Sequence, residues 1–260
     1  MTIIGEKLNS SIPKTLDAMK ARDEDYIVSL IKAQTAKGAD YIDVNTALMG
    51  DEEIKAMLWV IDLVKQHSNC GIMPDSPNPE VIIKAFEAIG DRAVIINSIT
   101  GEEKYRVLYD YILQKGCGVV CMPMGENGFP MTSAERLKNA DSIVSELKAR
   151  GVNPDNIYVD IVVQAIAADM EAAKAALETL TKIKSVLGVR TIGGMSNISF
   201  GLPMRKHINT AFLSMAMLSG LDAAIIDITS DPVRSTVYAS NALLGVDEYC
   251  LEYIGYTREE

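Results

Sequence analysis

Short apolar runs alternate with longer helical stretches along the whole chain, with about eight such pairs in 260 residues. The runs are mostly apolar, which is typical of strands buried on both faces of a parallel sheet. Eight strand–helix pairs favour an α/β fold of the (β/α)8 barrel type over a doubly wound sheet. The predicted strands are 3–9, 41–45, 70–73, 93–98, 118–124, 157–160, 189–192 and 223–227. The predicted helices are 14–38, 51–67, 79–89, 102–115, 132–150, 169–187, 207–219 and 232–244.

Local signals agree with this alternation. Thr132 and Glu135 have the spacing of a capping box, and Pro232 suits the first turn of a helix. No linker rich in proline, glycine or serine divides the chain, and no block of like charge does so. We therefore expect one domain over residues 1–260, a single TIM barrel.

The overall charge excludes several classes of partner. The 35 acidic residues outnumber the 25 basic ones, for a net charge of −10, which disfavours nucleic acid and anionic membranes. The N-terminus lacks a basic signal-peptide region, and no apolar run approaches the roughly twenty residues that span a bilayer. We expect a cytoplasmic protein.

The cysteines and histidines give little support for a metal site. The four cysteines form no Cys-x-x-Cys pair and the chain has only two histidines, so a structural zinc site is improbable and we expect no bound metal. Cys117 and Cys121 are expected to be reduced, buried residues rather than a disulfide.

Polar residues gather where the predicted strands end. Any one of them could simply form a turn or cap a helix. In a barrel, however, all these strand ends meet at one mouth, where enzymes of this fold carry their active sites. The residues at these ends are Glu6, Asn9, Asp43, Asn45, Asp75, Asn97, Asp160, Asn197 and Asp227.

The composition of this mouth indicates a neutral heterocyclic ligand. Only Lys7 and Arg205 supply nearby cations, and Gly193-Gly194 lacks the spacing of a phosphate-binding loop. A carboxylate accepts two N–H groups side by side, and an asparagine both donates and accepts. A pterin ring has such an edge. Both histidines fall on predicted helices, which excludes a Ser-His-Asp arrangement at the strand ends.

The loop 193–205 joins a strand to a helix and contains three glycines, a proline, two serines and one asparagine. Such loops carry catalytic groups when the scaffold is a barrel. We therefore place the chemistry in this loop and expect polar groups from the other strand ends to face Asn197.

At these residues the sequence resembles the pterin-binding methyltransferases, that is, the methyltetrahydrofolate:corrinoid protein methyltransferases and the folate domain of cobalamin-dependent methionine synthase. The resemblance keeps its order over essentially the whole chain. It rests on residues 4–9 (IGEKLN), 42–45 (IDVN), 74–76 (PDS), 96–98 (INS), 158–160 (YVD), 194–199 (GMSNIS), 205 (R), 211–216 (AFLSMA) and 221–225 (LDAAI). Pro74 and the bulky exit at residues 121–126 depart from the pattern that we expect.

The resemblance implies a role for each group at the mouth. Asp75, Asn97 and Asp160 bind the pterin ring, and Asn197 approaches N5, the atom that carries the methyl group. No side chain resembles a dedicated general acid, so the N5 proton is expected to move through water and the network of Glu6 and Asp160. Asn197, Asp160 and Glu6 are therefore the predicted catalytic residues.

Four further positions complete the predicted folate site. Asp43 belongs to the polar network around the ring, and backbone near Gly194 and Ser196 lines the pocket. Arg205 lies toward the aminobenzoate-glutamate part of folate. The substrate is tetrahydrofolate or 5-methyltetrahydrofolate, and the resemblance implies that a partner supplies the corrinoid (cobalamin).

The resemblance further implies a homodimer and a corrinoid protein as partner. It leaves open whether the methyl group leaves folate or is moved to it, as in the catabolism of a methylated amine or betaine. Two alternatives are kept. One is a dihydropteroate synthase-like enzyme, although its usual Ser-x-Arg pair near the last strand is absent. The other is a non-catalytic subunit that only presents folate.

Overall fold

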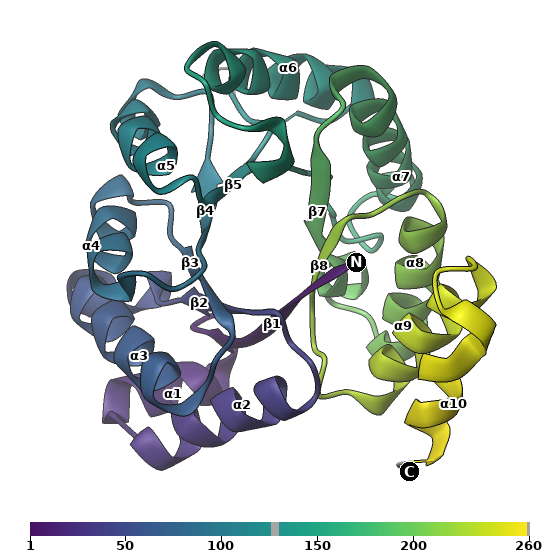
Figure 1. Ribbon diagram of the computed structural model, residues 1–260, viewed down its shortest axis with the longest axis horizontal. Coiled ribbons are helices and arrows are strands. Elements are labelled where there is room, and N and C mark those ends of the chain that lie inside the picture. The colour runs from purple at the N-terminus through teal and green to yellow at the C-terminus, as the bar shows by residue number, and fades with distance from the viewer. Residues whose placement is uncertain (126–129, 259–260) are drawn as a thin grey trace.

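Eight parallel strands close into a barrel in sequence order (Figure 1). The computed structural model describes residues 1–125 and 130–258, so Glu126 of the departure noted above lies outside the described residues. The barrel confirms the predicted (β/α)8 fold. Its strands are β1 (Thr2–Asn9), β2 (Tyr41–Asn45), β3 (Gly71–Asp75), β4 (Ile95–Ile99), β5 (Gly118–Cys121), β6 (Ile157–Asp160), β7 (Arg190–Gly194) and β8 (Ala223–Ile226).

Helices surround the barrel and cover its outer face (Figure 1). They are α1 (Pro13–Ala21), α2 (Glu24–Ala36), α3 (Glu53–His67), α4 (Pro79–Ile89), α5 (Tyr109–Lys115), α6 (Ser133–Ala149), α7 (Ala172–Lys182), α8 (Arg205–Leu218), α9 (Asp231–Leu243) and α10 (Leu251–Arg258). The connections at the carboxyl ends of the strands include short helical turns: η1 (Ala47–Glu52), η2 (Glu103–Leu108) and η5 (Met195–Ser199).

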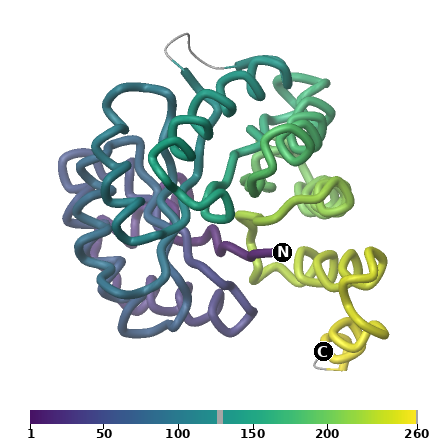
Figure 2. The backbone as a smooth tube through the Cα atoms, turned by 45° about the horizontal axis from the view of Figure 1, so that its top comes forward, coloured from purple at the N-terminus to yellow at the C-terminus, as the bar shows by residue number. Residues whose placement is uncertain are grey.

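Most predicted elements lie where the sequence places them, and two predictions were wrong. The stretch 14–38 is two helices, because Arg22 adopts a left-handed conformation (φ 55°) that ends α1. Asp23 then starts α2 by accepting the amide N–H of Tyr26. The second wrong prediction is that the helices end at residue 244, because α10 follows. It packs on α9 and stands away from the ring of helices (Figure 2). The capping box at Thr132 and the first-turn position of Pro232 are confirmed.

The hydrophobic core has two layers. The larger layer lies between the strands and the helices, and the smaller one fills the barrel interior with residues such as Ile4, Met73 and Tyr158. Tyr41 packs against this inner layer near the amino-terminal end. A side chain at Gly71 would meet the Tyr41 ring at 2.3 Å, so glycine makes room for the ring there. The amino-terminal part of the barrel is thus filled, as is usual for this fold.

Two further expectations bear on the environment of the chain. Cys117 and Cys121 are buried free thiols, as predicted, and Cys70 and Cys250 are also free. Within the described ranges, no helix has both the length and the apolar character needed to cross a membrane.

Candidate functional site

Polar residues occupy the carboxyl-terminal layer of the barrel interior because side chains alternate along a strand. Residues two apart on a strand point to the same face. Met73 and Ile95 belong to the inner core layer, so Asp75 and Asn97, two positions further on, also face inward. Asp160 follows Tyr158 in the same way. The pattern of each strand therefore brings these three predicted site residues to one mouth.

Four of these residues form two hydrogen-bonded pairs. Asn45 and Asp75 are register partners, and Asn45 Nδ2 donates to Asp75 Oδ2 over 2.8 Å. Asp75 is also the register partner of Asn97, whose Nδ2 lies 3.5 Å from Asp43 Oδ1. Each carboxylate thus receives a neutral amide rather than a cation. Their remaining lone pairs are available to the N–H groups of a ligand.

Burial makes these carboxylates unusually basic. Removal from water raises the pKa of Asp75 to about 6 and that of Asp160 to about 6. Burial also raises the pKa of Asp43 well above its ordinary range, and the charge of Asp75 adds to this effect. Perturbed carboxylates that face one another in a buried site are typical of ligand-binding and catalytic centres.

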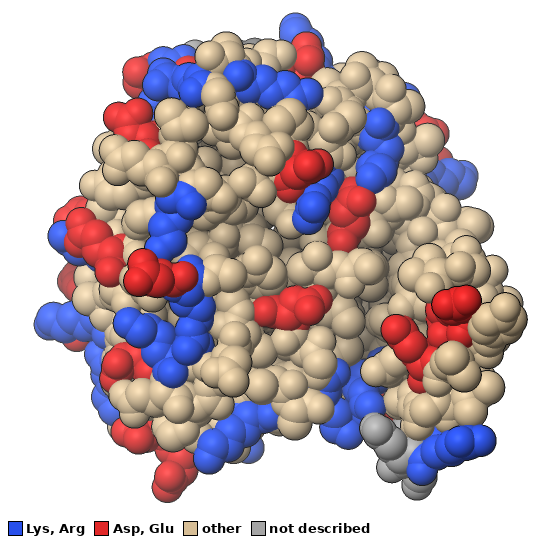
Figure 3. All heavy atoms as spheres, viewed as in Figure 1, with Lys and Arg blue, Asp and Glu red and all other residues tan. Residues whose placement is uncertain are grey.

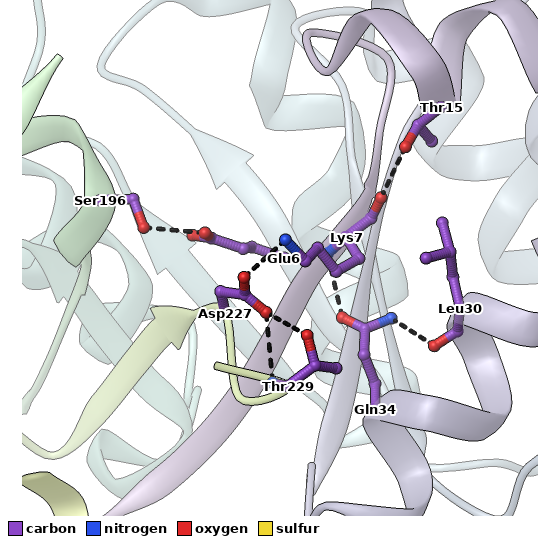
Figure 4. A network of polar contacts seen from close by, with 8 residues as sticks. All are labelled: Glu6, Lys7, Thr15, Leu30, Gln34, Ser196, Asp227 and Thr229. Carbon is purple, nitrogen blue, oxygen red and sulfur yellow. Dashed lines mark hydrogen bonds and ion pairs between the residues drawn. The ribbon is translucent and has the colours of Figure 1, made fainter. Parts of the chain in front are cut away.

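A bulge in β1 directs two charged side chains into the mouth. The pairing of β1 with β2 shifts between Gly5 and Leu8, so Glu6 and Lys7 occupy an irregular segment. The buried Gln34 of α2 accepts the N–H of Lys7 over 2.9 Å and donates to Leu30 O (Figure 4). A side chain at Gly5 would meet Gln34 Oε1 at 2.3 Å, so glycine is required for this contact.

The bulge residues form two separate contacts in the mouth. Lys7 Nζ lies 2.5 Å from Asp227 Oδ2, and Asp227 also accepts the Thr229 hydroxyl (Figure 4). The Ser196 hydroxyl donates to Glu6 Oε1 over 2.8 Å. Burial raises the Glu6 pKa to about 7, although the Ser196 hydrogen bond opposes the increase. Glu6 can therefore accept or donate a proton near neutral pH.

Asn197 lies on η5, the short turn that follows β7, and its side chain is exposed. Its amide lies against the Gly194 backbone, because a side chain at Gly194 would meet Asn197 Nδ2 at 3.1 Å. Arg205 faces this turn: its guanidinium donates to Ser196 O over 2.7 Å and to Ser199 Oγ over 3.0 Å. The predicted contact of Arg205 with the folate tail stays a prediction, and in this structure Arg205 fixes the turn that carries Asn197.

The structure thus places the predicted site residues at the carboxyl-terminal mouth, on the turn beside it or, for Arg205, at the start of α8. The sequence did not identify two residues that contact or support the predicted site, Asn45 and Arg136. Asn45 was recognised as a strand-end residue but not selected, and its role follows from its register with Asp75. Arg136 on α6 lies fully buried behind Asp160 and donates to Ile161 O, directly after that carboxylate.

The comparisons with known proteins agree with this geometry. The model of the family described as "Pterin binding enzyme" matches residues 5–227. The chain therefore belongs to the pterin-binding enzyme family. A methylcorrinoid:tetrahydrofolate methyltransferase from Eubacterium limosum is 33% identical over 259 residues, which cover 97% of this chain and 94% of that protein. This relationship makes the chain an enzyme of the methyltransferase class and confirms the resemblance seen in the sequence.

More distant relatives share either part of their length or only the fold. The methionine synthase of Mycobacterium tuberculosis is 28% identical over 239 residues, and the matched part is 20% of its length. Among solved structures, the dihydropteroate synthase from Xanthomonas albilineans in complex with 7,8-dihydropteroate superposes with a TM-score of 0.67 at 17% identity. It covers 95% of this chain, and the alignment covers 94% of that one. At this identity the likeness shows the barrel fold alone.

Proposed function

We propose that this enzyme moves a methyl group between N5 of tetrahydrofolate and the cobalt of a corrinoid. The pterin ring lies in the mouth of the barrel, between Asp75, Asn97 and Asp160, with Asp43 behind it. The observation that carries the proposal is the pairing of buried carboxylates with neutral amides at this mouth. These groups suit a neutral ring with several N–H donors and carbonyl acceptors.

The chain's own residues control the charge that develops on N5. When the methyl group leaves N5, the nitrogen needs a proton or a hydrogen bond; when N5 gains the methyl group, it loses a proton. The Asn197 amide serves both directions, because its NH2 group donates to a lone pair and its oxygen accepts from N–H. Glu6 holds the exchanged proton, which passes through water, since burial raises its pKa to about 7. A preorganised hydrogen bond of this kind contributes about 2.7–4 kcal/mol to a reaction barrier.

A large partner brings the cobalt. Exposed apolar side chains stand on the connections that follow β2, β4, β5, β6 and β7, all on the carboxyl-terminal side of the barrel. Apolar groups around a polar site are typical of a surface that binds a macromolecule. A corrinoid protein that docks there would bring its methyl carrier over the folate. These side chains are Leu48, Val107, Met131, Met170, Phe200 and Met204.

We propose that the methyl group moves toward tetrahydrofolate, in the catabolism of a methylated compound such as an amine or betaine. The relative that covers nearly the whole chain is named for this direction. In this direction N5 gains the methyl carbon and releases its proton, while the electrons of the broken cobalt–carbon bond stay on the cobalt. Ionised Glu6 then accepts the proton through water.

We also propose a homodimer formed through the last helices. α8 packs on α9 and α9 on α10, and their outer surfaces carry exposed apolar residues away from the mouth. Sedimentation of the wild-type chain and of Leu218→Glu/Leu243→Glu tests this proposal. We expect a dimer and a monomer respectively, and a monomeric wild type would contradict it. The exposed residues are Met215, Leu218, Leu243, Val246, Tyr249 and Leu251.

The test of the function is a spectroscopic assay with methylcobalamin and tetrahydrofolate, run without oxygen and in both directions. We expect loss of the methylcobalamin absorbance together with formation of 5-methyltetrahydrofolate. Folate binding without any change in the cobalamin spectrum would instead indicate a non-catalytic subunit. Condensation of a pterin pyrophosphate with 4-aminobenzoate would indicate a dihydropteroate synthase-like enzyme.

A further inference from the structure

Arg136 is a fully buried arginine that the reaction described above does not use. It lies on α6, where Ala140, Ile143 and Leu147 form the buried stripe, and its own side chain is 0% exposed. A buried guanidinium is costly unless its N–H groups are satisfied. A residue of this kind within an apolar stripe therefore needs a specific explanation.

The guanidinium joins two connections at the mouth. Its Nε donates to Pro130 O over 3.3 Å, ahead of α6, and one terminal nitrogen donates to Gln164 Oε1 over 2.7 Å. The other terminal nitrogen lies 3.4 Å from Ile161 O. All three acceptors are neutral, and among the described residues no carboxylate lies within 4.0 Å of the guanidinium. The positive charge of Arg136 therefore acts on carboxylates that do not contact the guanidinium directly, namely Asp160 and Asp169.

The backbone after Asp160 is held in an unusual conformation. Val162 has φ 57°, in the left-handed region that β-branched residues rarely adopt. This conformation directs the Val162 N–H back to Asp160 Oδ1 over 2.6 Å. Strain of this kind persists only where surrounding contacts fix the backbone. The hydrogen bonds from Arg136 to Ile161 and Gln164 fix it on both sides of Val162.

The same connection reaches the turn that carries Asn197. The Ile166 N–H donates to Ile198 O over 3.0 Å, and the Ile161 N–H donates to Ile192 O of β7. A change in the path of residues 161–166 would therefore displace both Asp160 and the turn around Asn197.

The charges around Asp160 come from three elements. Asp75 of β3 raises the Asp160 pKa, whereas Arg136 of α6 and the Val162 N–H lower it. Asp160 and Asp169, which precedes α7, both favour the charged form of Arg136 against its burial. Among the groups that affect the Asp160 pKa, Arg136 supplies the positive charge.

We propose that Arg136 is a positioning residue for the pterin-binding carboxylate: it fixes the backbone that aims Asp160 into the mouth, and its charge favours the ionised form of Asp160. The part of this proposal that concerns pterin rests on the proposed function. The coupling between Arg136 and Asp160 does not rest on it, because it is a property of the chain without substrate.

The test is a pH titration of the Asp160 carboxyl carbon by NMR in the full chain, with Asp160→Asn used for assignment. The wild type is expected to titrate with a midpoint of about 6. In Arg136→Gln the midpoint is expected to rise by about one pH unit or more, because a nearby cation is lost. Arg234→Gln is the matched control, since Arg234 is also a buried arginine but lies on α9. It is expected to lower thermal stability without moving the midpoint.

Hydrogen exchange of the Val162 amide tests the positioning role separately. Arg136→Lys keeps the charge but not the fork of donors, so the Val162 N–H is expected to exchange at least about tenfold faster. Arg234→Lys should leave that rate unchanged. If Arg136→Gln does not fold, Val162 exchange in Arg136→Lys still tests the positioning role.

Two results would overturn the proposal: an Asp160 midpoint in Arg136→Gln equal to that in Arg234→Gln, or unchanged Val162 exchange in Arg136→Lys. Tetrahydrofolate binding is measured on the same samples. A wild type that binds no tetrahydrofolate would refute the proposed function, yet the titration and the exchange rates would still decide the role of Arg136.

Discussion

At the amino-terminal end of the barrel Asp222 pairs with a cation, whereas at the carboxyl-terminal end Asp43 and Asp75 each receive a neutral amide. Asp222 lies 2.8 Å from Lys184 Nζ and accepts the N–H and the hydroxyl of Thr191. Arg190 at the same end donates to the Tyr158 hydroxyl over 2.9 Å. Charged groups at the amino-terminal end are therefore paired within the chain and stabilise the barrel.

The two ends also differ in shape. A hollow of about 570 Å³ lies at the amino-terminal end and is lined by residues that include Thr2, Asp40, Tyr41 and Arg190. Figure 3, in the same view as Figure 1, shows acidic and basic side chains interspersed on the face that it draws. The polar residues at the carboxyl-terminal end are instead mostly carboxylates and amides. We therefore place the proposed substrate site by its unused hydrogen-bonding capacity and not by the size of a hollow.

Asn197→Ala should produce the largest effect. We expect methyl transfer to fall about 100–1000-fold, as when one preorganised donor is removed from an active site. Tetrahydrofolate affinity should change little, because the ring-binding groups remain. Steady-state assays and calorimetry measure the two quantities. Asn156→Ala is the control at the other end, where the Asn156 amide donates to Gly116 O. Wild-type turnover in Asn197→Ala would contradict the assigned role.

Asp75→Asn and Asp222→Asn compare the two ends directly. Asp75→Asn should weaken tetrahydrofolate binding roughly 10–100-fold, because a charge-assisted hydrogen bond contributes about 1.5–3 kcal/mol. Asp222→Asn should leave the affinity unchanged and lower the melting temperature, because it weakens the contacts with Lys184 and Thr191. Calorimetric titration and thermal melting test the pair. Equal losses of affinity in both variants would remove the distinction between the ends.

Glu6→Gln should change how stability depends on pH. The Glu6 pKa is about 7 in the folded chain against an ordinary 4.5, so ionisation of Glu6 destabilises the fold. The stability that Glu6 contributes below pH 4.5 is lost as the pH rises through about 7. Above pH 8 we expect Glu6→Gln to be more stable than the wild type by an amount on the order of 1–3 kcal/mol.

Chemical unfolding between pH 4.5 and 8.5 measures this difference. Ser196→Ala sharpens the test, because it removes a hydrogen bond that lowers the Glu6 pKa and should move the loss of stability to higher pH. Parallel stability curves for the wild type and Glu6→Gln over the whole range would show that Glu6 is not a perturbed carboxylate.

Proton release on folate binding should be the smallest effect. Asp75 and Asp160, each with a pKa of about 6, are partly protonated at pH 6 without ligand. The N–H groups of the pterin favour their ionised forms, so binding should release part of a proton at pH 6 and almost none at pH 8. Calorimetry in buffers of different ionisation enthalpy detects the release. Uptake of protons at pH 6 would contradict the proposed binding mode.

The sequence predicts the barrel because each short apolar run and each helical stretch is a local property of the chain, and eight such pairs follow one another. Side chains alternate along each strand, which places Asp75, Asn97 and Asp160 on the inward face, so their convergence follows once the barrel closes. The break between α1 and α2 was missed because one residue, Arg22, leaves the helical conformation.

Contacts between distant segments could not be predicted in the same way. The Ser196 hydroxyl meets Glu6 across 190 positions of the chain, and this contact depends on the bulge in β1. The guanidinium of Arg205 donates to Ser196 and Ser199 of the preceding loop, a contact that the sequence does not indicate. Arg136 left a usable signal, since a charged residue in the apolar stripe of a predicted helix indicates a buried polar contact.

A crystal structure of the chain with bound tetrahydrofolate tests the central claim most directly, because it decides which end of the barrel holds the substrate. We predict a pterin ring within hydrogen-bonding distance of Asp75, Asn97 and Asp160, with N5 on the side of Asn197. Tetrahydrofolate bound in the amino-terminal hollow beside Tyr41 and Arg190, with the mouth free of ligand, would contradict it.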